Sequence, residues 1–179
     1  MIYLIAGGTH LGKTTLAQKM LETYGYPYLS IDHLKMGLIR AGHTTLTPMD
    51  SDEDLTAYLW PIVREMIKTC IENDQNLIVE GCYIPFDWAK DFAEEYIEKI
   101  HTLWLIFSEN YLREKFDDVR QWASVTENRG EDPYLSIDEL FADTRRNLAG
   151  CKAHGCRYHL FDTAYDLDAA MARLVGTTE

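Results

Sequence analysis

Short apolar runs alternate with longer segments of helical period along the chain. The apolar runs occupy residues 2–6, 28–31, 76–80, 101–107 and 157–162. Three of them are apolar almost throughout, which favours strands buried on both faces over strands with one wet face. Strands that alternate with helices predict an α/β fold, in which helices cover both faces of a parallel sheet.

The helical segments carry their own start signals. The longest pattern spans residues 55–70, and Pro61 lies inside it. Because proline lacks the N–H group and clashes with the preceding turn, we expect a kink there or a later start of the helix. Ser108, Ser136 and Asp166 are predicted N-caps, so three further helices should begin just after these residues.

Length and charge restrict the classes of partner. The 179 residues are expected to form one domain, and 17 basic against 29 acidic residues give a formal net charge of −12. Duplex nucleic acid and anionic membranes are bound through positive surfaces, so neither is an expected partner. The chain has no apolar run of about 18 residues and no secretory pattern at its start, and we therefore expect a cytoplasmic protein.

The cysteines leave two interpretations open. The chain has four cysteines and no N-x-S/T acceptor site, which favours free thiols. One group, Cys151, His154, Cys156 and His159, contains ligand types that zinc accepts. Its offsets do not match a paired C-x-x-C site, so a metal site is the less favoured interpretation.

A glycine-rich motif follows the first predicted strand directly. It satisfies the pattern G-x-x-x-x-G-K-[ST] and consists of Gly7, Gly8, Thr9, His10, Leu11, Gly12, Lys13, Thr14 and Thr15. Such a loop points successive backbone N–H groups at a polyphosphate, and the helix after it adds the positive end of its dipole. Lys13 is predicted to reach the β- and γ-phosphates of ATP, and the Thr14 hydroxyl to bind Mg²⁺.

Charged residues follow the second and third predicted strands. Ligands gather at the carboxyl ends of parallel strands, so Asp32 should face the γ-phosphate, where it acts as a base or serves only as a helix cap. Lys35 or Arg40 is predicted to neutralise an anionic group of the phosphoryl acceptor. Glu80 ends a buried strand and should hold Mg²⁺ directly or through water, and Tyr83 after it is a candidate for lining the acceptor pocket.

These motifs together resemble the adenylate-kinase-like group of small P-loop kinases. The stretches YLSIDHLKMGLIR and LIVEGCYIPFDW are most similar to bacterial proteins described as 2-phosphoglycerate kinase or adenylate kinase homologues. The resemblance covers nearly the whole chain. It implies a three-layer α/β/α fold with a five-stranded parallel sheet in the order 2-3-1-4-5, an acceptor-binding insertion at about residues 32–60 and a lid at about residues 122–135.

The resemblance also implies arginines that contact the transferring phosphate. Arg129 is the best candidate in the lid, and Arg145 and Arg146 match a second phosphate-contacting position on the following helix, with Arg145 as the candidate catalytic residue. Arg120 fits a solvated surface position better. The turn at residues 162–165 resembles the place where the adenine base rests in that group.

Two departures from adenylate kinases bear on the acceptor. The chain has E-G-C-Y-I-P where those enzymes are similar in carrying D-G-F-P-R, and S-I-D where they have T-G-D. We therefore expect an ATP- and Mg²⁺-dependent kinase that phosphorylates a hydroxyl of a small metabolite or drug, including an acceptor with its own phosphate or carboxylate such as 2-phosphoglycerate. A nucleoside monophosphate kinase and an ATP-binding regulatory or toxin-like protein with little turnover are the alternatives.

Overall fold

The structure is a computed structural model that describes residues 1–122 and 136–176. Strands and helices alternate through both ranges. In chain order the elements are β1 Ile2–Ala6, α1 Lys13–Tyr24, β2 Tyr28–Ser30, α2 Ile31–Arg40, α3 Asp52–Glu72, β3 Leu77–Glu80, the 3₁₀ helix η1 Trp88–Asp91, α4 Glu94–Ile97, β4 Ile100–Phe107, α5 Glu109–Trp122, α6 Ile137–His154, β5 Tyr158–Phe161 and α7 Leu167–Val175.

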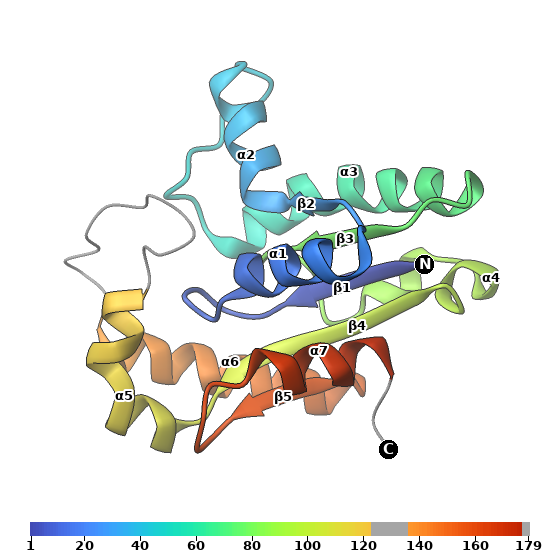
Figure 1. The fold of residues 1–179 in the computed structure, drawn as a ribbon. Coiled ribbons are helices and arrows are strands. Elements are labelled where there is room, and N and C mark those ends of the chain that lie inside the picture. The colour runs from blue at the N-terminus through green and yellow to red at the C-terminus, as the bar shows by residue number, and fades with distance from the viewer. Residues whose placement is uncertain (123–135, 177–179) are drawn as a thin grey trace.

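The strands form one parallel sheet in the order β2-β3-β1-β4-β5. This order confirms the α/β fold predicted from the pattern of the sequence and the sheet order that the resemblance implies. β1 lies in the middle, and β3 and β4 flank it (Figure 1). Ile5 on β1 and Ser30 on β2 are both in register with Glu80 on β3, so the carboxyl ends of the three strands lie at one edge of the sheet.

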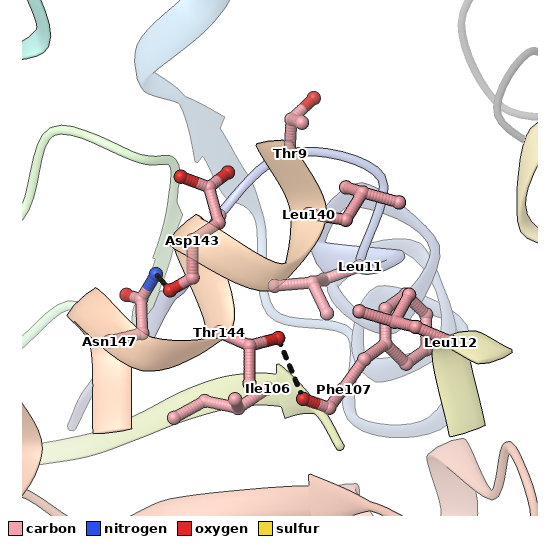
Figure 2. A pocket seen from close by; sticks show the side chains of 10 residues that line it. Thr9, Leu11, Ile106, Phe107, Leu112, Leu140, Asp143, Thr144 and Asn147 are labelled. Carbon is pink, nitrogen blue, oxygen red and sulfur yellow. Dashed lines mark hydrogen bonds between the residues drawn. The ribbon is translucent and has the colours of Figure 1, made fainter. Parts of the chain in front are cut away.

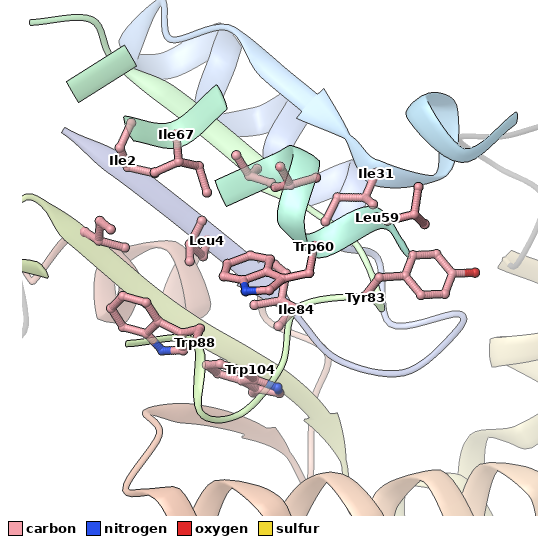
Figure 3. Close-up of a cluster of buried hydrophobic side chains, with 14 of the residues drawn as sticks. Ile2, Leu4, Ile31, Leu59, Trp60, Ile67, Tyr83, Ile84, Trp88 and Trp104 are labelled. Atoms are coloured by element: carbon pink, nitrogen blue, oxygen red, sulfur yellow. The ribbon is translucent and has the colours of Figure 1, made fainter. Parts of the chain in front are cut away.

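Helices cover both faces of the sheet and enclose two hydrophobic clusters. One cluster packs α3, η1 and the end of α6 against the sheet, and the other packs α1, α5 and α7 against the opposite face (Figure 1). Figure 3 shows part of the first cluster, where Leu4 of β1, Trp60 of α3 and Ile84 lie among other buried side chains. Because β1 is buried on both faces, its five residues are apolar without alternation.

The predicted caps are present. The Ser108 hydroxyl accepts a hydrogen bond from the Tyr111 N–H at 2.9 Å, Ser136 forms a capping box with Glu139, and Asp166 caps α7. Pro61 lies inside α3, which begins nine residues before it, so the predicted later start of that helix is wrong. The helix begins at Asp52 because the side chain of Ser51 accepts a hydrogen bond from the N–H group of Asp54 and so caps the first turn.

The predicted acceptor-binding insertion lies within the described residues, whereas nearly all of the predicted lid lies outside them. The insertion at residues 32–60 comprises α2, the connection after it and the first part of α3. The lid lies outside the described residues except for the end of α5, and Arg129 lies outside them as well. Among the described helices, none has both the length and the apolar character needed to cross a membrane.

Candidate functional site

The glycine-rich motif at residues 7–15, called the P-loop below, leads from the central strand β1 into the helix α1. β1 ends at Ala6 and α1 begins at Lys13. Gly12, the residue before the helix, has a φ of +74° and supplies no side-chain cap to the first N–H groups of α1, which are the groups that bind anions at a helix start. Lys13 is 6 % exposed and its ammonium donates a hydrogen bond to the carbonyl oxygen of Gly8. The loop therefore joins backbone donors and a buried cation, as phosphate binding requires.

Tyr165 lies against the P-loop from the turn after β5. Its hydroxyl donates a hydrogen bond to the carbonyl oxygen of Leu11 at 3.4 Å, and its ring contacts Phe161 with centroids 4.8 Å apart. Burial raises the pKa of Tyr165 to about 12, so the phenol remains protonated and can donate. The turn that was expected to lie near adenine thus contacts the P-loop backbone.

Replacing Gly12 by alanine is expected to weaken ATP binding by at least about tenfold. An added β-carbon would overlap the Tyr165 hydroxyl, and a φ of +74° disfavours any side chain. Gly25→Ala at the other end of α1 is the matched control, because φ is +70° there and the added carbon meets nothing within 4 Å. It should cost about 1 kcal/mol of stability and leave the ATP dissociation constant unchanged. Titration calorimetry with Mg²⁺ and a non-hydrolysable ATP analogue measures the dissociation constant of each variant. Equal affinities for the two variants would refute the role of Gly12.

Thr14 and Glu80 form the candidate metal position. The Thr14 hydroxyl donates a hydrogen bond to Oε1 of Glu80 at 3.2 Å, and Glu80 is 1 % exposed. Ser30, in register with Glu80 across the sheet, is 2 % exposed, and its hydroxyl makes no hydrogen bond to any part of the chain that the structure describes. A buried hydroxyl without a partner beside a buried carboxylate fits a site that takes a hydrated cation. The donor set, oxygen only, suits Mg²⁺.

Asp32, Lys35 and Tyr83 form a second cluster, on the acceptor side. Asp32 lies in the first turn of α2, directly after β2, and its Oδ1 accepts a hydrogen bond from Lys35 at 2.6 Å. The Lys35 ammonium also donates to the Tyr83 hydroxyl at 2.7 Å. The structure thus brings together three residues proposed from the sequence for the acceptor. Arg40, the fourth, is exposed at the far end of α2, about 12 Å along the helix from Asp32.

α6 brings a third group of charges to the P-loop. Oδ2 of Asp143 is 3.1 Å from the point that a β-carbon on Gly8 would occupy. Arg146 contacts Asp143 at 2.6 Å and Asp52, at the start of α3, at 3.7 Å. Burial raises the pKa of Asp143, although the charges of Arg146 and Lys13 oppose the shift. Arg146 therefore lies between the helix next to the P-loop and the helix on the acceptor side.

Arg145, which was predicted to contact phosphate, pairs with an acidic residue of α5 instead of contacting the P-loop. Its guanidinium pairs with Glu109 of α5 at 2.7 Å and lies over the Phe141 ring, 6.0 Å from the centroid. Arg120 is exposed in the last turn of α5. Of the three arginines, Arg146 is the one that contacts a residue beside the P-loop.

A small pocket lies between the P-loop and α6. Gly8, Thr9 and Leu11 line one side, and the other side is lined by Ile106, Phe107, Leu112, Leu140, Asp143, Thr144 and Asn147. Figure 2 shows the Thr144 hydroxyl donating to the carbonyl oxygen of Phe107 and the Asn147 amide donating to that of Asp143, at 2.9 Å each. The Thr144 bond attaches α6 to the end of β4, whereas the Asn147 bond lies within α6.

Three residues that were not predicted as site residues lie beside the candidate site. They are Ser30, Asp52 and Asp143. Ser30 ends the strand just before the candidate base Asp32, so its place at the carboxyl end of a predicted strand could have identified it from the sequence. Asp52 and Asp143 come from helices far along the chain, and only the packing of those helices brings them to the P-loop.

The cysteines are free, and the zinc interpretation finds no support in the geometry. All four cysteines lie in the described ranges, where no three His, Cys, Asp or Glu side chains come together as a metal site. Burial raises the pKa of Cys151 to about 12, which disfavours the thiolate that zinc requires. His154 stacks on Phe86, and His159 meets Phe161 edge to face.

Comparison with known proteins shows which fold this is. No protein-family model and no curated protein sequence matches the chain. Among solved structures, a candidate kinase from Chloroflexus aurantiacus J-10-fl is 17 % identical with a TM-score of 0.56, and covers 99 % of this chain and 98 % of its own. Shikimate kinase from Bacteroides thetaiotaomicron is 15 % identical with a TM-score of 0.52, covering 99 % and 97 %. An uncharacterized protein from Eubacterium ventriosum ATCC 27560 is 12 % identical with a TM-score of 0.52, covering 99 % and 97 %. The chain has the fold of the P-loop kinases.

Proposed function

We propose that the chain is an ATP- and Mg²⁺-dependent kinase that transfers the γ-phosphoryl group to a hydroxyl of a small molecule. One observation carries the proposal: the P-loop with Lys13, the Thr14–Glu80 pair and the Asp32 cluster all meet at the carboxyl ends of β1, β2 and β3. A P-loop alone shows only that ATP can bind, which holds for kinases and for ATP-binding regulatory proteins alike. A carboxylate opposite it, on the acceptor side, is what phosphoryl transfer to a hydroxyl uses.

The residues divide the reaction between them. Lys13 and the loop N–H groups bind the β- and γ-phosphates, and Thr14 with Glu80 would hold Mg²⁺, which neutralises charge on those phosphates when bound. The acceptor hydroxyl gives its proton to the Asp32 carboxylate while its oxygen attacks the γ-phosphorus. The bond from the γ-phosphorus to the bridging oxygen breaks, and its electron pair leaves with ADP.

Arginines complete the proposal. We infer that Arg146 releases Asp143 and Asp52 and turns to the transferring phosphate, because its two ion pairs are half exposed and already bridge the P-loop side and the acceptor side. Arg129 in the predicted lid and Arg145 keep the roles expected from the resemblance, Arg145 only after leaving Glu109.

Screening acceptors tests this function against its two alternatives. ADP release is measured with Mg²⁺ and ATP in the presence of hydroxyl metabolites, sugar acids including 2-phosphoglycerate, or nucleoside monophosphates. The proposal predicts that a hydroxyl compound other than a nucleotide raises ADP release. A rise with AMP alone would favour a nucleoside monophosphate kinase, and tight ATP binding with no acceptor effect would favour the regulatory alternative.

Replacing Thr14 by alanine is expected to raise the Mg²⁺ concentration for half-maximal activity at least about tenfold, because a metal-orienting hydroxyl is lost. Thr23→Ala is the matched control on the same helix, since the Thr23 hydroxyl bonds only to the Lys19 carbonyl in the last turn. Mg²⁺ titrations of ADP release measure the effect. A Thr14 variant with the parent's Mg²⁺ requirement would remove Thr14 from the metal position.

A further inference from the structure

Lys35 is an interior residue of the acceptor side. It is 9 % exposed, and two of its three ammonium protons go to Asp32 at 2.6 Å and to Tyr83 at 2.7 Å. The ammonium also lies 4.9 Å from the centroid of the Tyr83 ring. Burial lowers the pKa of Lys35, but the hydrogen bonds to Asp32 and Tyr83 and the charge interactions with these two residues together raise it by more, so its pKa lies above the ordinary value. Lys35 is thus a charged group already held by partners within the protein.

An anionic acceptor group would disturb this arrangement. If it contacted the third proton of Lys35, it would lie within a few ångström of the Asp32 carboxylate, because Asp32 and Lys35 are in direct contact. Like charges at that separation repel, and Asp32 has to remain ionised to accept the hydroxyl proton. If the anion displaced Asp32 instead, the candidate base would lose its position.

A second nearby cation, Arg146, is also held by acids. Arg146 pairs with Asp143 and Asp52, and α3 begins with an acidic turn of Asp52, Glu53 and Asp54. Around the P-loop and α2, the described residues that this site brings together are three cations, Lys13, Lys35 and Arg146, and four carboxylates, Asp32, Asp52, Glu80 and Asp143.

ATP itself adds negative charge when it binds. A second anion would therefore enter a site with little positive charge to spare.

We infer that Lys35 is a positioning residue that holds Asp32 through Oδ1, and that the acceptor is a hydroxyl compound that is neutral or positively charged, such as a polyol or an amino sugar. The inference rests on the proposed kinase function and narrows its substrate class. It replaces the expectation from the sequence that Lys35 binds an acidic group of the acceptor. Tyr83 then fixes Lys35 rather than the substrate.

A double-mutant cycle in urea unfolding tests the pairing without any acceptor. Lys35→Met and Asp32→Ala should each lower the unfolding midpoint, and the double variant should lose less than the sum of the two, because each single change leaves a group without its partner. Asp87 and Lys90 are the matched control pair, since they have the same three-residue spacing but side chains that are 40 % and 62 % exposed. Their cycle should show no coupling. A Lys35→Met variant that is as stable as the parent, with no coupling to Asp32, would overturn the pairing.

Kinetics with acceptors of matched shape tests the substrate class. Glucose, glucosamine, gluconate and 2-phosphoglycerate are compared for ADP release with saturating Mg²⁺ and ATP. We expect kcat/KM for a neutral or amine-bearing acceptor to exceed that of the anions at least tenfold, and Lys35→Met to lower kcat with the acceptor KM within threefold. An anion as the preferred acceptor, with a KM that Lys35→Met raises tenfold at unchanged kcat, would overturn the inference.

The two experiments distinguish a failure of the kinase proposal from a failure of the inferred acceptor class. If the protein binds ATP but phosphorylates none of these compounds and no other acceptor, the kinase proposal fails and the acceptor class fails with it. The unfolding cycle still decides whether Lys35 is the partner of Asp32. If phosphorylation occurs on an anion alone, the kinase proposal stands and only the acceptor class is wrong.

Discussion

Replacing Lys13 by alanine is expected to lower kcat/KM for phosphoryl transfer by at least about 10³-fold. Lys13 is 6 % exposed at the start of α1, and its ammonium lies within hydrogen-bond reach of the Gly8 carbonyl inside the loop. From there it reaches the phosphates and neutralises charge that grows on the bridging oxygen as ADP leaves. Water cannot replace a preorganised charge in a buried site, so we expect kcat/KM to fall much more than the free energy of unfolding would explain.

Lys19→Ala is the matched control for Lys13. Lys19 lies six residues further along the same helix, where its ammonium pairs with Asp168 at 2.6 Å on an exposed surface. ADP release and ATP affinity of this variant should stay within about twofold of the parent, as expected for a surface ion pair. A Lys13 variant that retains more than a tenth of the parental kcat/KM would contradict the assignment of the P-loop as a catalytic site.

Replacing Asp32 by asparagine is expected to lower kcat about 10²- to 10⁴-fold, the usual contribution of a general base. The asparagine oxygen can still accept the hydrogen bond from Lys35, so the shape of the acceptor side is retained while the proton acceptor is lost. ATP is bound by other residues, and its dissociation constant should therefore stay within about threefold of the parent.

Asp117→Asn controls for the loss of one negative charge. Asp117 is exposed on α5 and lies outside the clusters that form the site. Its kcat should equal that of the parent. If Asp32→Asn retained activity within about threefold of the parent, Asp32 would position the acceptor without serving as base, because positioning and charge neutralisation supply most of the catalysis of phosphoryl transfer.

Local features of the site could be predicted from the sequence. The P-loop is nine consecutive residues whose function depends on their own backbone, so the motif contains nearly all of the information. Asp32 and Glu80 could be placed because each follows an apolar run, and parallel strands end at one edge of the sheet. The three-residue spacing of Asp32 and Lys35 even allows an ion pair within one helical turn.

Contacts between distant segments could not be predicted. Tyr83 contacts Lys35 from 48 residues away, and this contact supports the inference that Lys35 positions Asp32 instead of binding the acceptor. Arg145 and Arg146 are neighbours in sequence, but adjacent residues on a helix point about 100° apart. Only the packing of α6 decides that Arg146 meets Asp143 beside the P-loop while Arg145 meets Glu109.

Transfer of a labelled γ-phosphoryl group from ATP to a small molecule is the most direct measurement of the proposed function. The protein is incubated with Mg²⁺, γ-labelled ATP and a mixture of hydroxyl metabolites, and products are separated and identified by mass spectrometry. We predict one labelled phosphate ester for each ADP formed, absent from the Lys13→Ala variant and retained by Lys19→Ala. Label that appears only as inorganic phosphate, or not at all while ATP binds, would contradict the account.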